Sequence, residues 1–235
     1  MKKDLVIGIL GGMGTYATIH AFKQYAEIFE AEKEWDRPRI IIDNRCTMPS
    51  RVRAYLYKEN EDVLVEQMEE SISNLIKSGA NKIILACNTS HLFLEKIYNR
   101  NPILKEYVVN IIECCSNKIK KSNINGKILI LGSEGTIDSE IYQKSLTEEN
   151  INYDVPKKEE YEMIRMCIEA VKQNKFTSEA KDVFCELAKR NSSCILGCTE
   201  LPILYEKYKD CIKGIEVYDP IKVTLEYIKE NYYEE

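Results

Sequence analysis

The sequence predicts an α/β protein made of two pseudo-symmetric, doubly wound parallel-sheet domains with the active site between them. Short runs rich in isoleucine and leucine alternate with helical patterns along the 235 residues, which is typical of parallel strands covered by helices on both faces. The pattern also has two halves. Each half opens with a strand, a glycine turn and a helix, and closes with a strand, a cysteine (Cys87 or Cys198) and a helix.

The first half begins with a buried strand and a tight glycine turn at 11–14. Val65, Met68, Ile72 and Leu75 recur at helical spacing, which indicates a helix facing a core. In this half we expect strands at 5–10, 39–43, 83–87 and within 107–112, and helices at 16–32, 61–77, 88–98 and up to 121.

The second half repeats the opening with an apolar run at 127–132 and a turn at 133–136. Pro220 suits the first turn of a final helix. In this half we expect strands at 127–132, 151–155, 193–198 and 214–217, and helices up to 149, at 158–173, at 178–190, up to 208 and from 220. We expect the last strand and helix to return to the first domain, so that residues 1–103 plus 212–235 form one domain and 104–211 the other.

Composition excludes several classes of protein. The formal charge of −5 offers no basic excess for nucleic-acid phosphates, and no apolar run approaches the roughly 18 residues of a membrane helix. The apolar stretch near the N-terminus is short and is followed by glycines, so we do not expect it to be a signal peptide. Nine cysteines, an odd number, indicate reduced thiols and a cytoplasmic protein, and their spacing matches no common zinc pattern.

Cys87 stands where a buried strand should stop and a helix begin, and the cap-forming residues Asn88, Thr89 and Ser90 follow it. Unpaired backbone N–H groups and the helix dipole at such a position favour thiolate over thiol. Cys198 repeats the arrangement, so we predict that the two cysteines face each other across one site. We expect the other cysteines to be structural: Cys46, Cys114, Cys115, Cys167, Cys185, Cys194 and Cys211.

The glycine turn has a rival interpretation. The segment from Gly12 to Ala17 fits the G-x-G-x-x-A form of a dinucleotide fingerprint, and Asp43 ends the next strand as a ribose-binding acid would. This interpretation predicts NAD binding, but it leaves the matched cysteines unexplained.

Other polar residues each have a functional and a structural interpretation. His91 either tunes the Cys87 thiolate or hydrogen-bonds locally, while His20 is expected to be structural. Arg45 and Arg51 share a polar loop after a strand, where they could clamp carboxylates or lie in solvent. Lys172, near a helix end, would ordinarily lie on the surface.

Several motifs, in order along nearly the whole chain, closely resemble the aspartate/glutamate racemase family. They are Gly11-Gly12-Met13-Gly14-x-x-Ala17-Thr18, Cys87-Asn88-Thr89-x-His91, Gly135-Thr136 and Gly197-Cys198-Thr199-Glu200. The resemblance implies two α/β domains with one catalytic cysteine from each, no cofactor and no metal, and a homodimer. It also matches the family's arginine with Arg51 and its lysine with Lys172. The substrate-binding set it implies is Met13, Arg51, Asn88, Thr89, Ser133, Thr136, Lys172, Thr199 and Glu200.

The expected reaction is racemisation of an acidic amino acid, aspartate first and glutamate second. One cysteine, as thiolate, removes the Cα proton, and the other, as thiol, delivers a proton to the opposite face. Asn88, Thr89 and Thr199 would hold the α-carboxylate, while Arg51 and Lys172 would take the side-chain carboxylate, with Arg45 as an extra cation.

The chain departs from the family pattern around this expected side-chain pocket, at Thr15, Arg45, Cys46, Ser50, Ser133 and Glu134. The alternatives are a related cysteine-dependent isomerase or decarboxylase on the same scaffold, and a nucleotide- or amino-acid-binding protein without turnover.

Overall fold

The computed structural model describes residues 5–122, 124 and 126–233. The chain divides into two compact units, one comprising the residues up to Cys114 and from Ile221 onwards, the other Cys115–Pro220. These boundaries fall later in the chain than the predicted ones. No helix among the described residues is long and apolar enough to cross a membrane.

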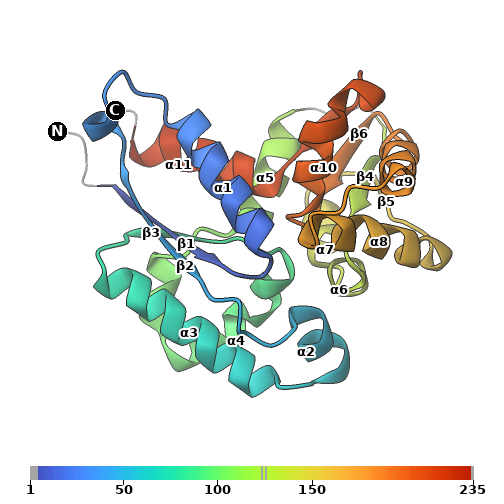
Figure 1. Cartoon of the computed structure of the whole chain (residues 1–235). Coiled ribbons are helices and arrows are strands. Elements are labelled where there is room, and N and C mark those ends of the chain that lie inside the picture. The colour runs from blue at the N-terminus through green and yellow to red at the C-terminus, as the bar shows by residue number, and fades with distance from the viewer. Residues whose placement is uncertain (1–4, 123, 125, 234–235) are drawn as a thin grey trace. The chain divides into compact units, whose positions relative to one another are not determined.

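The first unit contains a three-stranded parallel sheet in the order β2-β1-β3. Its strands are β1 (Val6–Gly11), β2 (Arg39–Asn44) and β3 (Lys82–Leu85). Its helices are α1 (Thr15–Ile28), α2 (Arg51–Tyr57), α3 (Glu61–Lys77), α4 (Leu94–Arg100), most of α11 (Pro220–Tyr232) and the start of α5 (Ile111–Lys121). Helices α1 and α11 lie on one face of this sheet, and α3 and α4 on the other (Figure 1). The alternation predicted from sequence is thus confirmed here.

The second unit contains a four-stranded parallel sheet in the order β5-β4-β6-β7. Its strands are β4 (Ile128–Leu131), β5 (Tyr153–Asp154), β6 (Ser193–Leu196) and β7 (Glu216–Tyr218). Its helices are α6 (Glu134–Asp138), α7 (Ile141–Glu148), α8 (Tyr161–Lys172), α9 (Ser178–Ala188) and α10 (Leu201–Tyr208) (Figure 1). Both units are therefore α/β with purely parallel sheets, as predicted.

Each unit has its own apolar core. In the first, the buried face of α3, including Leu64, Met68 and Ile72, packs with the side chains of β3 and with Cys87. In the second, α8 and α9 bury Ile168 and Phe184 with the strand β6. Burial of such faces is the main stabilising contribution in both units, because removing apolar surface from water is favourable.

Three expectations about the elements are wrong. The segment 107–112 makes only one isolated bridge, between Val108 and Ile83, because its chain turns into α5 at Ile111. The last strand, β7, does not return to the first sheet; it pairs with β6. The turn after β4 is the helix α6, which Ser133 caps by accepting a hydrogen bond from the Thr136 N–H.

A disulfide joins Cys185 of α9 to Cys211 in the 3-10 turn Lys209–Ile212. The expectation that all cysteines are reduced is therefore wrong for this pair. The two side chains meet because α9 and the turn after α10 pack together, a contact that spacing along the chain could not reveal. The pair closes a loop that contains β6 and Cys198.

Candidate functional site

The glycine turn is packed against the loop that follows β2. Gly12 has φ +81°, and a Cβ placed on it would lie 2.4 Å from the backbone carbon of Arg45. The Thr18 hydroxyl braces the turn by accepting from the Gly12 N–H at 3.0 Å and donating to the Gly14 carbonyl at 3.0 Å. Neighbouring backbone therefore explains the glycine at position 12 without reference to a bound dinucleotide.

Arg51 and Met13 connect this turn to α2. The Arg51 guanidinium donates to the Met13 carbonyl at 2.7 Å and to the Pro49 carbonyl at 3.0 Å. The Met13 side chain is buried, and its sulfur accepts a hydrogen bond from the Ser90 hydroxyl at 3.0 Å. The structure thus brings together Met13, Arg51 and the segment after Cys87, and Arg51 has a backbone-bracing role that the sequence did not suggest.

Cys87 lies two residues beyond the end of β3, with 8% of its surface exposed. Asn88 and Thr89 are also buried. The segment that follows is the 3-10 turn Thr89–Phe93, and Asn88 at its N-cap makes no capping hydrogen bond through its side chain. The strand-to-helix transition is as predicted, but side-chain capping at Asn88 is not.

His91 hydrogen-bonds locally. Its Nδ1 lies 3.0 Å from the Cys87 carbonyl oxygen, and its Nε2 accepts from the Ile111 N–H at 3.4 Å. Nδ1 therefore carries the proton, and the ring contacts the Cys87 backbone rather than donating to the sulfur. Burial lowers the pKa of His91 to about 4, with the two carbonyl hydrogen bonds opposing the shift. His91 is thus neutral at physiological pH.

The charged group of Arg45 contacts the helix α3. Its guanidinium forms an ion pair with Glu70 at 2.7 Å and donates to the Gln67 carbonyl and the Ser71 hydroxyl. These contacts hold the guanidinium against the helix, and the expected role of Arg45 as an extra substrate cation stays a prediction. The alternative interpretation, that Arg45 lies in solvent, is wrong.

Cys46 is exposed and belongs to a small polar cluster with Asn44 and Thr15. The Cys46 sulfur lies 3.2 Å from the Thr15 hydroxyl, and the Asn44 amide donates to both. Two departures from the family pattern, Thr15 and Cys46, therefore contact each other.

In the second unit, Cys198 lies two residues beyond β6 and is partly exposed. Its sulfur donates to Glu200 Oε2 at 3.0 Å. Burial raises the pKa of the Cys198 thiol well above its ordinary value, and the Glu200 carboxylate raises it further, while the Glu200 backbone N–H and Lys172 oppose the rise. Thr199 and Glu200 are buried beside it.

Lys172 ends α8 close enough to interact with this pair. Its ammonium donates to Glu169 at 3.0 Å. Burial lowers the pKa of Lys172, but the carboxylates of Glu200 and Glu169 and the Cys198 sulfur outweigh it and raise the pKa overall. Lys172 is thus held as a cation within the electrostatic reach of Cys198, rather than being an isolated surface charge.

Ser133 and Thr136 support the segment before Cys198. The Thr136 hydroxyl donates to the Gly197 carbonyl at 3.1 Å and lies 3.1 Å from the Ser133 hydroxyl. Thr136 is buried, and its methyl group occupies the space over Gly132 and Gly197. These contacts indicate that Thr136 positions the Cys198 peptide; they do not test its predicted contact with substrate.

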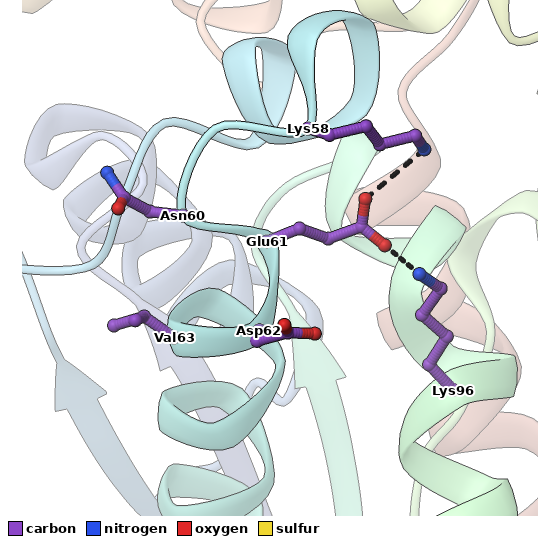
Figure 2. A pocket seen from close by; sticks show the side chains of 6 residues that line it. All are labelled: Lys58, Asn60, Glu61, Asp62, Val63 and Lys96. Atoms are coloured by element: carbon purple, nitrogen blue, oxygen red, sulfur yellow. Dashed lines mark hydrogen bonds and ion pairs between the residues drawn. The ribbon is translucent and has the colours of Figure 1, made fainter.

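A pocket of about 410 Å³ in the first unit is lined by none of the predicted site residues (Figure 2). Its lining residues are Lys58, Asn60, Glu61, Asp62, Val63 and Lys96. Glu61 is buried at 7% exposure and forms ion pairs with Lys58 at 3.2 Å and with Lys96. The periodicity of α3 gave no signal for this buried acid, because its burial depends on α2 and α4. Within the described part of the chain, no cluster of His, Cys, Asp and Glu could hold a metal ion.

The predicted residues thus fall into two sets: Met13, Arg51 and Cys87 in the first unit, and Cys198, Glu200 and Lys172 in the second. That the two cysteines face each other stays a prediction. Their places in the two sheets are equivalent, however. Cys87 follows β3, which pairs with the first strand of its unit, β1, and Cys198 follows β6, which pairs with β4.

Comparison with known proteins identifies similar chains. An aspartate racemase structure from Picrophilus torridus has a TM-score of 0.83 and 27% identity, covering 97% of this chain and 94% of that one. The broad-specificity amino-acid racemase RacX of Bacillus subtilis is 27% identical over 204 residues, 83% of this chain and 86% of RacX. A glutamate racemase of Carboxydothermus hydrogenoformans is 28% identical over 169 residues, which span 71% of this chain but only 61% of that protein.

The sequence pattern of the family described as Asp/Glu/hydantoin racemase matches residues 10–228. The match includes both cysteine segments, the glycine turn and the strands from β2 to β7. The chain therefore belongs to the Asp/Glu/hydantoin racemase family, whose named members similar to it are amino-acid racemases.

Proposed function

We propose that this protein racemises an acidic amino acid, aspartate first and glutamate second, without a cofactor. The observation that carries the proposal is the equivalent placement of Cys87 and Cys198, each two residues beyond the strand that pairs with the first strand of its unit. Racemisation needs a base and an acid on opposite faces of one carbon, and two like side chains can exchange these roles. The similarity to an aspartate racemase and to a broad-specificity racemase supports the choice of reaction.

In the proposed mechanism one cysteine, as thiolate, takes the Cα proton, and the other, as thiol, returns a proton to the opposite face. The Thr199 side chain and backbone N–H groups next to the cysteines would hold the α-carboxylate, with Asn88 and Thr89 on the other side. Hydrogen bonds to this carboxylate would stabilise the carbanion-like transition state, where negative charge develops. Arg51 and Lys172 would bind the side-chain carboxylate. We expect the protein to be a cytoplasmic homodimer.

The test is solvent exchange at Cα. The purified protein is incubated with L-aspartate or L-glutamate in D₂O, and deuterium and the D-enantiomer are measured by NMR and chiral chromatography. Both should appear without added cofactor. The variants Cys87→Ser and Cys198→Ser should each lose racemisation, whereas the exposed Cys46→Ser should keep the protein folded as a matched thiol control. Exchange with neither amino acid would count against the proposal.

A second candidate is a decarboxylase or isomerase that uses one cysteine. The different surroundings of the two thiols favour this candidate. Cys198 is partly exposed and donates a hydrogen bond to Glu200, whereas Cys87 is buried. Full activity on a substituted malonate or on maleate after substitution of one cysteine would identify this class.

A further inference from the structure

The Cys198 sulfur has a specific hydrogen-bond acceptor two residues further along the chain. Glu200 Oε2 lies 3.0 Å from the sulfur, and the Glu200 side chain is buried, with the residue only 2% exposed. Glu200 stands at the N-cap of α10 with helical backbone angles, φ −78° and ψ −32°, so the start of the helix sets the backbone that carries the carboxylate. A carboxylate held in this way keeps its position relative to the sulfur.

This geometry favours the protonated form of Cys198, because the thiol donates its proton to Glu200 Oε2. An ionised carboxylate only accepts hydrogen bonds, so the contact exists when Cys198 is protonated and becomes a repulsion between two anions when it is a thiolate. The charged and titratable groups that influence Cys198 are Glu200, Lys172 of α8 and Tyr142 of α7. Lys172 lowers the pKa of the Cys198 thiol, whereas Glu200 raises it. The Lys172 ammonium also pairs with Glu169, so its positive charge is shared between two carboxylates.

We propose that Glu200 is a positioning residue that keeps the proton on Cys198, so that Cys198 is the proton donor of the resting enzyme. Cys87 then receives the first proton from substrate. The enantiomer whose Cα–H bond faces Cys87 reacts with the resting form. After one turnover the proton must return to Cys198, through solvent or through the reverse reaction. The assignment of donor rests on the proposed function, whereas the effect of Glu200 on the Cys198 thiol does not.

The first test therefore measures thiol reactivity. Iodoacetamide alkylates thiolates, and mass spectrometry of the Cys198 peptide gives the alkylation rate as a function of pH. The Cys198 midpoint is the pH at which its alkylation rate is half maximal. In Glu200→Gln, which preserves the shape of the side chain but removes the charge, this midpoint should fall by about one pH unit or more. In Lys172→Met it should rise. Glu160→Gln, which removes a carboxylate paired with Arg190 in the same unit, should leave the midpoint unchanged.

Two buried cysteines report whether the variants stay folded. Cys194 in β6 and Cys167 in α8 are almost fully buried, so their slow alkylation indicates that the second unit is intact. A lower Cys198 midpoint with protected Cys194 and Cys167 supports the inference. An unchanged Cys198 midpoint in Glu200→Gln, with these two protected, overturns it. If Glu200→Gln exposes them, Glu200→Asp, whose shorter side chain withdraws the carboxylate from the sulfur, is measured instead, and a Cys198 midpoint equal to that of the unsubstituted protein also overturns the inference.

The second test uses racemisation. The pH profile of kcat/KM needs one ionised and one protonated cysteine, so its basic limb should follow Cys198 and move to lower pH in Glu200→Gln. Because the two enantiomers have equal free energies, kcat/KM must change by the same factor in both directions, which checks the data. Absence of racemisation with a shifted alkylation midpoint rejects the proposed function only. Racemisation with an unshifted midpoint rejects the role of Glu200 only.

Discussion

The hydroxyl of Thr136 donates a hydrogen bond to the backbone carbonyl of Gly197 at 3.1 Å, across 61 residues of sequence. The contact joins the start of α6 to the residue before Cys198. It explains why a polar residue is fully buried after β4, because the carbonyl satisfies it. The position of the Cys198 peptide therefore depends on a side chain from the helix α6.

Thr136→Val keeps the shape of this side chain but removes the hydrogen bond. We expect the free energy of unfolding to fall by about 1 kcal/mol, because the Gly197 carbonyl loses its partner in a buried place. Urea denaturation measures the change. Thr147→Val removes a comparable bond to the Gln143 carbonyl within α7. If both variants lose stability but only Thr136→Val loses racemisation, the hydrogen bond between Thr136 and Gly197 matters for the site. Equal racemisation activities of the two variants would contradict this role.

His91 makes stability depend on pH. The folded ring has a pKa of about 4 because of burial, whereas an exposed histidine titrates near 6.5. The unfolded chain therefore binds a proton between these values while the folded chain does not, and stability falls as pH decreases from 6.5 to 4. Between pH 7.5 and 5 we expect a loss of about 2 kcal/mol from this group. Urea denaturation of His91→Gln should lack this part of the slope, and an identical slope would refute the assignment.

Gly12→Ala and Gly214→Ala form a matched pair. Both glycines have positive φ, +81° and +85°, but a Cβ on Gly12 meets the Arg45 backbone at 2.4 Å while one on Gly214 meets nothing within 4 Å. Gly214→Ala should cost about 1 kcal/mol from backbone strain alone. Gly12→Ala should cost clearly more and displace the turn that carries Met13. Thermal unfolding of the two variants measures this difference. Equal losses of stability would show that the loop after β2 moves to make room for the added methyl group.

Glu61 joins the start of α3 to Lys58 and Lys96 at the pocket of Figure 2. Both lysines are largely exposed, so we expect Glu61→Gln to lower stability by only about 1 kcal/mol, less at high salt. Asp210→Asn, which removes an exposed pair with Lys213, is the control and should change nothing measurable. A salt-independent loss would point to lost packing rather than lost charge attraction.

The disulfide between Cys185 and Cys211 predicts a thiol count. Under denaturing conditions without reductant, seven of the nine cysteines should react with Ellman's reagent. The bond closes a separation of 26 residues, so its loss in Cys185→Ser/Cys211→Ser should lower stability by about 3 kcal/mol through the entropy of the unfolded chain. Nine reactive thiols, with equal stability of the parent and the double variant, would show that the pair is reduced in solution.

Sequence alone determined the α/β class and the strand that precedes each of Cys87 and Cys198, although both strands end two residues before the cysteine rather than at it. These follow from local signals, namely continuous apolar runs for buried parallel strands and capping residues after them. The helix α3 was predicted with its observed bounds, Glu61–Lys77, because its apolar period and Gly79 are both local. The family resemblance rests on the same short motifs.

Only the tertiary structure decided which partners these side chains have. It placed Arg45 against Glu70, His91 against the Cys87 carbonyl and Glu200 against the Cys198 sulfur. It also put β7 beside β6 and Cys185 beside Cys211. Strand order and long-range contacts depend on how separate elements pack, and that packing minimises exposed apolar surface and unpaired polar groups over the whole unit, which no local pattern encodes.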